Sequence, residues 1–504
     1  MPTPTPVATR PLPRHRHGRR IGGALVLLVA ATTASGAAIG DAAAPTAVAI
    51  GADPYTNTSS QHATQVEPDS FAYGSTIVTA AQTGRFTNGG ASNICFSTSS
   101  NSGSTWTNGC LPGITKHQNA ANPYDRVSDP VVAYDAKHGV WMISSLPLLE
   151  AGGVRGAGVL TSRSTDGGFT WTAPVLVTDS NLGNPDKNWI VCDNTSTSPY
   201  YGNCYAQWDD NGDGNRLYMS TSTDGGLTWG SRKKPANNAT GIGGQPVVQP
   251  SGRVIVPVDN ANETALLAFS STNGGASWSA TTTITTISHH TVAGSLRTGP
   301  LPSAEIDAAG KVYVVWQDCR FRKGCKSNDI VMTTSTDGVT WSRVVRIPID
   351  ATTSSVDHFI PGLAVDSATS GSTAKLALAY YYYPTANCTS STCSLRIGFV
   401  SSANGGGAWT APIQLGTSMS LSWLPSTTQG RMVGDYISTS YSGGTAFPVF
   451  IVALAPTGTQ FAQLMYSMSS GLSSGAAVAT AGGDQPVPSA VLQRVPPQAP
   501  IRAV

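Results

Sequence analysis

Six copies of one short pattern, Ser-x-Asp/Asn-x-Gly-x-Thr/Ser-Trp, run through this chain and constrain its fold more than any other feature. Their tryptophans lie 49 to 68 residues apart. The copies are Ser99–Trp106, Ser164–Trp171, Ser222–Trp229, Ser271–Trp278, Ser335–Trp341, which is one residue shorter, and Ser402–Trp409, which has Ala408 in the hydroxyl position. A repeat of this length with short strands and glycine turns predicts a radial β-architecture.

The residue types in the pattern suit the closing turn of a β-hairpin. Asp and Ser side chains hydrogen-bond the backbone of a tight turn, Gly supplies a positive φ, and Trp buries its ring beside the hairpin. The chain therefore resembles the Asp-box (BNR-repeat) sialidase-like β-propellers of secreted bacterial type. The copies predict the fold and leave the chemistry open.

Composition supports an all-β fold, because the 504 residues include 54 glycines and 33 prolines and only 12% are charged. A second repeated element, a small or polar residue followed by an apolar strand, occurs seven times, beginning near Glu67, Asp129, Asp186, Gly244, Ser303, Pro361 and Gly434. Seven inner strands for six boxes predict a seven-bladed propeller whose last blade lacks a box. Six blades with additional strands are the alternative.

The N-terminus has the pattern of an export signal. Four arginines between positions 14 and 20 precede the apolar stretch Ile21–Ile39, and Ala42–Ala44 and Ala47–Ala49 offer cleavage sites. We expect cleavage after Ala49, which gives a signal segment over 1–49, a propeller over 50–469 and an Ala/Pro/Gly-rich tail over 470–504. The expected location is extracellular, and no other segment is apolar enough to span a membrane.

The eight cysteines fall into four near neighbours, which suits an exported protein with local disulfides. The expected pairs are Cys95–Cys110, Cys192–Cys204, Cys319–Cys325 and Cys388–Cys393. Five arginines and one aspartate lie within residues 1–49, so the net charge falls from +2 to −2 without them. Such a charge leaves no basic field for nucleic acid. We expect a monomer that meets an extracellular carbohydrate and no membrane.

The starts of the inner strands bring polar side chains to one rim of the propeller: Glu67, Asp69, Asp129, Asp186, Glu305, Asp357, Asp435 and Tyr436. Glycoside hydrolysis needs an acid and a base or nucleophile that flank the scissile bond. We assign Asp129 and Glu305 as the acid/base set and Tyr436 as a nucleophile or stacking group. The expected substrate-binding residues are Arg126, Arg297, Arg431, Asp435 and His358.

The resemblance to sialidases is incomplete at one motif. The family's Arg-Ile-Pro sequence belongs near the first inner strand, where this chain reads Gln65-Val66-Glu67-Pro68-Asp69. Its one Arg346-Ile347-Pro348 follows the fifth box, on an expected outer strand. The family's arginine clamp for sialic acid therefore cannot be assigned residue by residue.

The stretch Asp209–Asn215 matches the first half of a calcium-binding loop, D-x-N-x-D-G. Asp209, Asn211, Asp213 and Asn215 are the candidate ligands for a structural Ca²⁺. The later bidentate Glu is absent, because Ser220 occupies that position. A plain Asn/Asp-Gly hairpin turn is the alternative, and no other cofactor is expected.

Three functions fit these observations. The first is a secreted sialidase-like glycoside hydrolase that acts on an extracellular glycan. The second is a non-catalytic propeller that binds glycan or protein, which the missing Arg-Ile-Pro favours. The third is a polysaccharide lyase, in which His and Tyr serve as base and acid.

Overall fold

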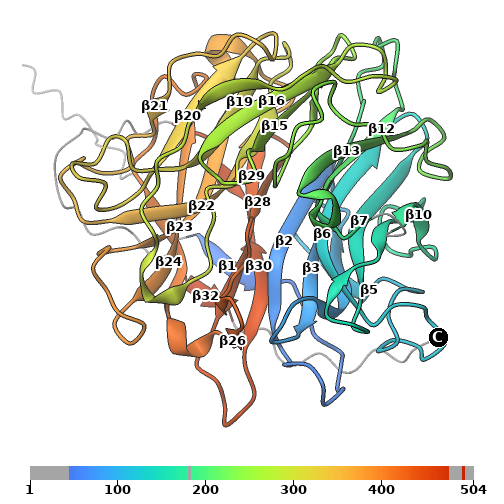
Figure 1. The fold of residues 1–504 in the computed structure, drawn as a ribbon. Helices are drawn as coiled ribbons and strands as arrows, with labels where there is room; N and C mark the ends of the chain where they lie inside the picture. Colours follow the sequence, from blue (N-terminus) through green and yellow to red (C-terminus); the bar gives the residue numbers. More distant parts are fainter. Residues whose placement is uncertain (1–44, 180–182, 476–490, 494–504) are drawn as a thin grey trace, which may run out of the picture. The chain divides into compact units, whose positions relative to one another are not determined.

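The computed structural model describes residues 45–179, 183–475 and 491–493. Within these ranges, regular structure is β-strand except for four short 3₁₀ turns: η1 (Asn211–Asp213), η2 (Ala293–Ser295), η3 (Gly371–Thr373) and η4 (Leu421–Trp423). The strands form antiparallel sheets in sequence order, as the prediction of an all-β propeller required (Figure 1). None of the described helices is long and apolar enough to cross a membrane.

The first two repeats are joined into one sheet. The first contains β2 (Gln65–Tyr73), β3 (Thr76–Arg85), β4 (Ala91–Ser99) and β5 (Thr107–Cys110). The second contains β6 (Arg126–Asp135), β7 (Val140–Leu149), β8 (Arg155–Gly156), β9 (Gly158–Ser164) and β10 (Val175–Asp179). The link between them is one pairing, Ala91 opposite Val127.

Four separate sheets follow along the chain. They are β11 (Pro185–Cys192), β12 (Cys204–Asp210) and β13 (Arg216–Ser222); β14 (Val247–Val248), β15 (Val254–Asp259), β16 (Ala265–Ser271) and β17 (Thr282–Thr286); β18 (Ser303–Ile306), β19 (Val312–Asp318), β20 (Asp329–Ser335) and β21 (Val345–Arg346); and β22 (Asp357–Val365), β23 (Leu376–Tyr383), β24 (Ser394–Ser402) and β25 (Ile413–Ser420). A small hairpin, β26 (Ser426–Thr427) and β27 (Gly430–Arg431), precedes the last sheet.

The last sheet combines strands from both ends of the chain. It contains β28 (Ser438–Ser442), β29 (Thr445–Ala453), β30 (Gln463–Met468), β31 (Leu472–Ser473), β1 (Thr46–Ala49) and β32 (Val491–Gln493). Strand β1 runs antiparallel to β30 and parallel to β32. In Figure 1 the blue β1 and β2 lie beside the orange and red strands β28 and β30.

This sheet bears on the expected domain boundaries, which stay a prediction. Residues 46–49, assigned above to the signal segment, pair with Tyr466, Ser467 and Met468. Strand β32 falls within the expected tail 470–504. The stretch 1–44 lies outside the described residues. The number of blades also stays a prediction, although all seven expected inner-strand starts lie in or just before β2, β6, β11, β14, β18, β22 and β28.

The Asp-box turns form as their chemistry predicts. Ser164 Oγ accepts from Gly168 N at 2.9 Å, and Asp166 Oδ1 accepts from Thr170 N at 3.0 Å. Trp171 folds back, so that its Nε1 donates to Gly168 O at 3.0 Å and its ring packs on Phe96. All four expected disulfides are present, and each closes a local hairpin or loop.

Candidate functional site

The inner strands share a backbone irregularity that positions the site. Strands β2, β6, β11 and β22 each contain a bulge, where the register with the next strand shifts. The residue at each bulge has a positive φ without being glycine: Glu67 (53°), Asp129 (50°), Lys187 (46°) and Ile360 (49°). Three of the four precede a proline. Bulges re-aim side chains, and a left-handed backbone at an ordinary residue is uncommon enough to mark a functional position.

Two bulge carboxylates, Glu67 and Asp129, and Asp435 from the segment before β28 meet the bulge residue Lys187. Lys187 Nζ lies 3.6 Å from Glu67 Oε1 and 3.5 Å from Asp129 Oδ2, and it also donates to Asp435 Oδ2. Arg297 pairs with the same oxygen of Asp435 from the segment before β18. We call Glu67, Asp129, Lys187, Arg297 and Asp435 the inner-strand cluster. Glu67, Asp129, Lys187 and Asp435 are each at most 7% exposed.

The pKa values within the inner-strand cluster are pushed apart. Burial, together with the neighbouring Asp129 carboxylate, raises the pKa of Glu67 to about 8. Burial also acts on Asp435, but Arg297 and Lys187 outweigh it and hold the pKa of that carboxyl well below its usual range. The three carboxylates in turn raise the pKa of Lys187 against the effect of its burial. At neutral pH Glu67 therefore keeps its proton while Asp435 is ionised.

A small cavity adjoins the inner-strand cluster. Its lining includes Asp129, Lys187, Trp189, Leu301 and Tyr436. The buried Oδ2 of Asp129 has no hydrogen-bond partner, although Lys187 Nζ lies 3.5 Å away, and Asp129 lines this cavity. Tyr436 Oη donates to Pro130 O at 2.9 Å, and burial followed by the nearby Glu67 carboxyl raises its pKa well above the usual value. A tyrosine that attacks a substrate needs a lowered pKa. Because the pKa of Tyr436 is raised, its hydroxyl is better suited to position neighbouring groups than to act as a nucleophile.

Four of the expected site residues therefore come together: Asp129, Arg297, Asp435 and Tyr436. Glu305 does not join them. Burial and then the Asp69 carboxyl raise its pKa to about 8, so its electrostatic neighbour is Asp69 and not Lys187. Asp69 itself accepts from Val132 N at 2.7 Å and ties β2 to β6. Glu305 lies on β18 three residues beyond Pro302, which lines the cavity, and this offset separates it from the inner-strand cluster.

The remaining expected substrate-binding residues point elsewhere. Arg126 lies over the Phe86 ring at 3.9 Å and pairs with Glu150. Arg431 donates to Leu424 O, and its own carbonyl accepts from Arg297 N at 2.8 Å, so it supports the segment that carries Arg297. His358 is buried beside Tyr380 and Tyr382.

The loop expected to bind calcium forms the hairpin between β12 and β13. Asp213 Oδ2 accepts from Tyr218 Oη at 2.7 Å, whereas Asp209 Oδ2 accepts from Asn215 Nδ2 at 3.3 Å. Asn211 donates to Asp186 Oδ2 at 3.2 Å. The two asparagines thus present amide hydrogens to carboxylates: Asn215 bonds to Asp209, Asn211 to Asp186, and Asp213 bonds separately to Tyr218. This geometry is that of the hairpin-turn alternative, and calcium binding here stays a prediction.

Another group of possible metal ligands does converge, namely Asp329, Asp350 and His358. Two arginines already neutralise its carboxylates. Arg322 and Arg346 each pair with both Asp329 and Asp350. Burial lowers the pKa of His358. The charges balance without an ion, so an ion-pair network explains this group as well as a metal would.

Lys187 is the residue of the inner-strand cluster that the sequence analysis did not name. The sequence analysis assigned the preceding residue, Asp186, to the rim of the propeller. Lys187 is the next residue along the strand. The sequence could have shown this, because Lys187 holds the same position in its repeat as Glu67 and Asp129 hold in theirs. A one-residue shift in a strand exchanges the two faces.

The chain matches the family model described as a BNR repeat-like domain over residues 74–306 and 153–364. It belongs to this family. No curated protein matches the chain.

Several solved structures are similar to the chain at low identity. A protein of unknown function from Dyadobacter fermentans is 15% identical, with a TM-score of 0.47 over 71% of this chain and 98% of that one. An ulvan lyase, a polysaccharide lyase, is 10% identical, with a TM-score of 0.48 over 84% and 96%. The NanB sialidase from Streptococcus pneumoniae is 13% identical, with a TM-score of 0.41 over 82% and 70%.

Proposed function

We propose that this BNR-repeat protein is a secreted, sialidase-like glycoside hydrolase that acts on an extracellular glycan at the inner-strand cluster. One observation carries the proposal. Three carboxylates from separate segments of the chain converge on one lysine, and Glu67 keeps its proton at neutral pH while Asp435 is ionised. Carboxyl pairs with separated pKa values are the acid and base of glycoside hydrolysis.

The roles follow from the partners of each group. Glu67, whose pKa lies near 8, is the proton donor to the leaving oxygen. Asp129 is the base or nucleophile, because it lines the cavity and Lys187 at 3.5 Å favours its charged form. Asp435 is held by both cations and orients them. Lys187 and Arg297 stabilise negative charge on an acidic sugar or on the leaving group.

An extracellular location agrees with the four disulfides, because disulfides persist in oxidising compartments. The bonded cysteines leave no free thiol among the described residues. A monomer that meets an extracellular carbohydrate, without nucleic acid or a membrane, remains part of the proposal.

The test is turnover by the purified protein on a panel of aryl glycosides and acidic polysaccharides. Release of reducing ends without formation of an unsaturated, ultraviolet-absorbing product supports hydrolysis. Glu67→Gln and Asp129→Asn should each lower kcat by at least about 100-fold, whereas Asp366→Asn, a carboxylate at the far end of β22, serves as the matched control. No turnover on any substrate, or equal loss in the control, would overturn the proposal.

A non-catalytic glycan-binding propeller is the second candidate, and the deep burial of the inner-strand cluster favours it. In that case the cluster is an ion network that fixes the inner strands, and its variants lose stability before they lose glycan binding. The third candidate, a polysaccharide lyase, is distinguished from a hydrolase by its product. Elimination leaves a carbon–carbon double bond that absorbs ultraviolet light, whereas hydrolysis leaves none.

A further inference from the structure

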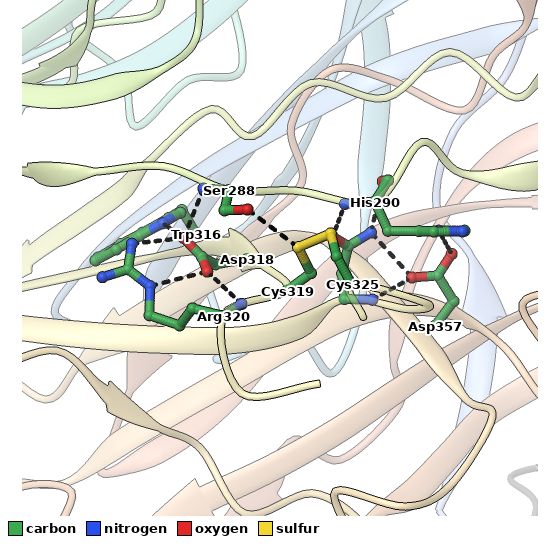
Figure 2. Close-up of a disulfide and its surroundings, with 9 residues drawn as sticks. Ser288, His290, Trp316, Asp318, Cys319, Arg320, Cys325 and Asp357 are labelled. Atoms are coloured by element: carbon green, nitrogen blue, oxygen red, sulfur yellow. Dashed lines mark hydrogen bonds and ion pairs between the residues drawn. A yellow bond between two sulfur atoms is a disulfide. The ribbon is translucent and has the colours of Figure 1, made fainter. Parts of the chain in front are cut away.

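The disulfide Cys319–Cys325 closes a strongly basic loop between β19 and β20. Residues 319–326 read Cys-Arg-Phe-Arg-Lys-Gly-Cys-Lys, which places four cations and no acid in eight positions. Two of these cations have fixed structural partners. Arg322 is buried on Asp329 and Asp350, and Arg320 pairs with Asp318 and lies over the Trp316 ring at 5.8 Å (Figure 2).

The other side chains of this loop face solvent. Lys323 and Lys326 are exposed, and neither forms an ion pair within the described part of the chain. Phe321 is exposed by 38%, which is unusual for a phenylalanine. The disulfide therefore holds two unpaired ammonium groups and an aromatic ring at the surface.

A groove of about 520 Å³ lies against this loop. One wall is Ile284 and Thr285, next to Arg320 and Phe321 of the loop, and the other is the stretch 342–346. Arg343 in that stretch is exposed and has no ion pair among the described residues. No carboxylate lines the groove, and its two sides come from the outer strands β17 and β21 of successive sheets.

We propose that the groove and the basic loop bind an acidic polysaccharide chain. Exposed cations without carboxylate neighbours create a positive potential, and a guanidinium matches a carboxylate or sulfate in two hydrogen bonds. The exposed Phe321 ring, the apolar Ile284 and Val344, and the hydroxyls of Thr285 and Ser342 suit the faces and hydroxyls of a sugar. The volume is that of an ordinary ligand site, in the range of about 300–1,000 Å³.

The groove is connected to the inner-strand cluster through one segment, residues 287–302. Ser288 O accepts from Cys319 N at 2.6 Å and His290 bonds to Asp357 beside the disulfide, while Arg297 farther along pairs with Asp435 (Figure 2). A chain held in the groove would thus lie beside the segment that reaches the proposed active site. This accessory role rests on the proposed function, but binding in the groove needs no catalysis.

The test compares two variants with the same change in net charge. Lys323→Ala/Arg343→Ala removes one exposed cation from the basic loop and one from the wall of the groove. Lys233→Ala/Lys234→Ala removes two exposed cations that do not line it. The measured quantity is the Kd for heparin and for polygalacturonate at low salt, with circular dichroism to confirm folding.

We expect the groove variant to bind both polysaccharides about tenfold more weakly and the control variant to bind like the wild type. Phe321→Ser should also weaken binding. Equal weakening in both double variants, or no binding by the wild type, would overturn the proposal. Tighter binding of single-stranded DNA than of either polysaccharide would assign the groove to nucleic acid and overturn it as well. Because these readouts need no turnover, they stay separate from failure of the proposed hydrolase.

Discussion

The Asp-box turns and the inner-strand bulges both recur through the chain. The boxes repeat side-chain hydrogen bonds, whereas the bulges repeat a backbone conformation. In the box at Ser164–Trp171, the Ser and Asp side chains make the hydrogen bonds of the turn, and Ser222–Trp229 repeats the same bonds. In the bulges the backbone repeats, with φ near 50°, while the side chain changes from acid to base to isoleucine.

The difference shows where repeated structure leaves room for function. A box needs a Ser and an Asp or Asn side chain to close its turn, so those two positions tolerate few residue types. A bulge is formed by backbone pairing and a following residue that is often proline, which frees its side chain for other tasks. In this chain that freedom brings Glu67, Asp129 and Lys187 together.

The largest effect should come from Lys187→Met, which leaves three carboxylates without their shared cation. Removing one partner of a buried ion pair costs about 3–5 kcal/mol of unfolding free energy, and activity should also be lost. Lys375→Met is the matched control, since the Lys375 side chain is 38% exposed and pairs with Asp366; it should cost about 0–1 kcal/mol. Urea unfolding measures the free energy of unfolding of both variants. Equal losses would show that the inner-strand cluster contributes no more to stability than a surface ion pair.

Trp171→Ala should cost a similar free energy without touching the inner-strand cluster. Loss of a large buried aromatic costs about 3–5 kcal/mol, and Trp171 is 9% exposed. Phe169→Ala in the same box is the control, because Phe169 is already 38% exposed, and it should change stability by about 0.5 kcal/mol or less. A folded Trp171→Ala protein with lost turnover would show that the boxes are not purely structural.

Removing β1 should weaken the last sheet. A protein that begins at residue 50 lacks the pairs of Ala47, Val48 and Ala49 with β30, whereas one that begins at residue 45 keeps them. We expect the shorter protein to melt a few degrees lower, because a loss of 1 kcal/mol shifts Tm by about 2–4 °C in larger domains. Equal melting temperatures would show that the pairing of β1 adds little to stability, and cleavage after Ala49 stays a prediction.

Stability should fall as the pH rises from about 5.5 to 8. Burial raises the pKa of Glu67 and of Glu305 to about 8, above the ordinary 4.5. Between these values the folded protein holds protons that the unfolded chain has released, so the free energy of unfolding decreases with pH. Thermal melts across this range should show the slope, and Glu67→Gln should flatten it. A slope of opposite sign, or one that Glu67→Gln leaves unchanged, would contradict the assignment.

The smallest effect concerns the hairpin at Asp209–Asn215. Because its side chains bond to separate partners, Asp213→Ala should change stability by about 0.5 kcal/mol or less, and a chelator should leave Tm unchanged. Calorimetry with Ca²⁺ provides the second measurement. A rise in Tm with Ca²⁺ that disappears in Asp213→Ala would restore the calcium hypothesis.

The sequence alone predicted the features that rest on local chemistry. Each Asp-box places its hydrogen-bonding residues within eight positions, so the turn follows from the motif. The same holds for the disulfides, because each pair spans one hairpin or one short loop. The all-β propeller followed from the spacing of the boxes and the apolar strands between them.

The candidate site was only partly predictable. Asp129, Arg297, Asp435 and Tyr436 were expected to meet and do, because equivalent positions of neighbouring inner strands face one another. Lys187 was missed and Glu305 misplaced, because one residue of register, or one bulge, decides which side of a strand a side chain occupies. The partners of Arg126, Arg431 and His358 likewise depend on contacts between segments far apart in the sequence.

The repeat, the turns and the cysteine pairs were therefore determined by the sequence itself, since their interactions close over short stretches of chain. Only the tertiary structure decided that β1 joins β30, that three acids share Lys187 while the pKa values of Glu67 and Asp435 move apart, and that a basic loop borders an open groove. Burial and charge proximity set these properties, and both arise from residues that the fold brings together across hundreds of positions.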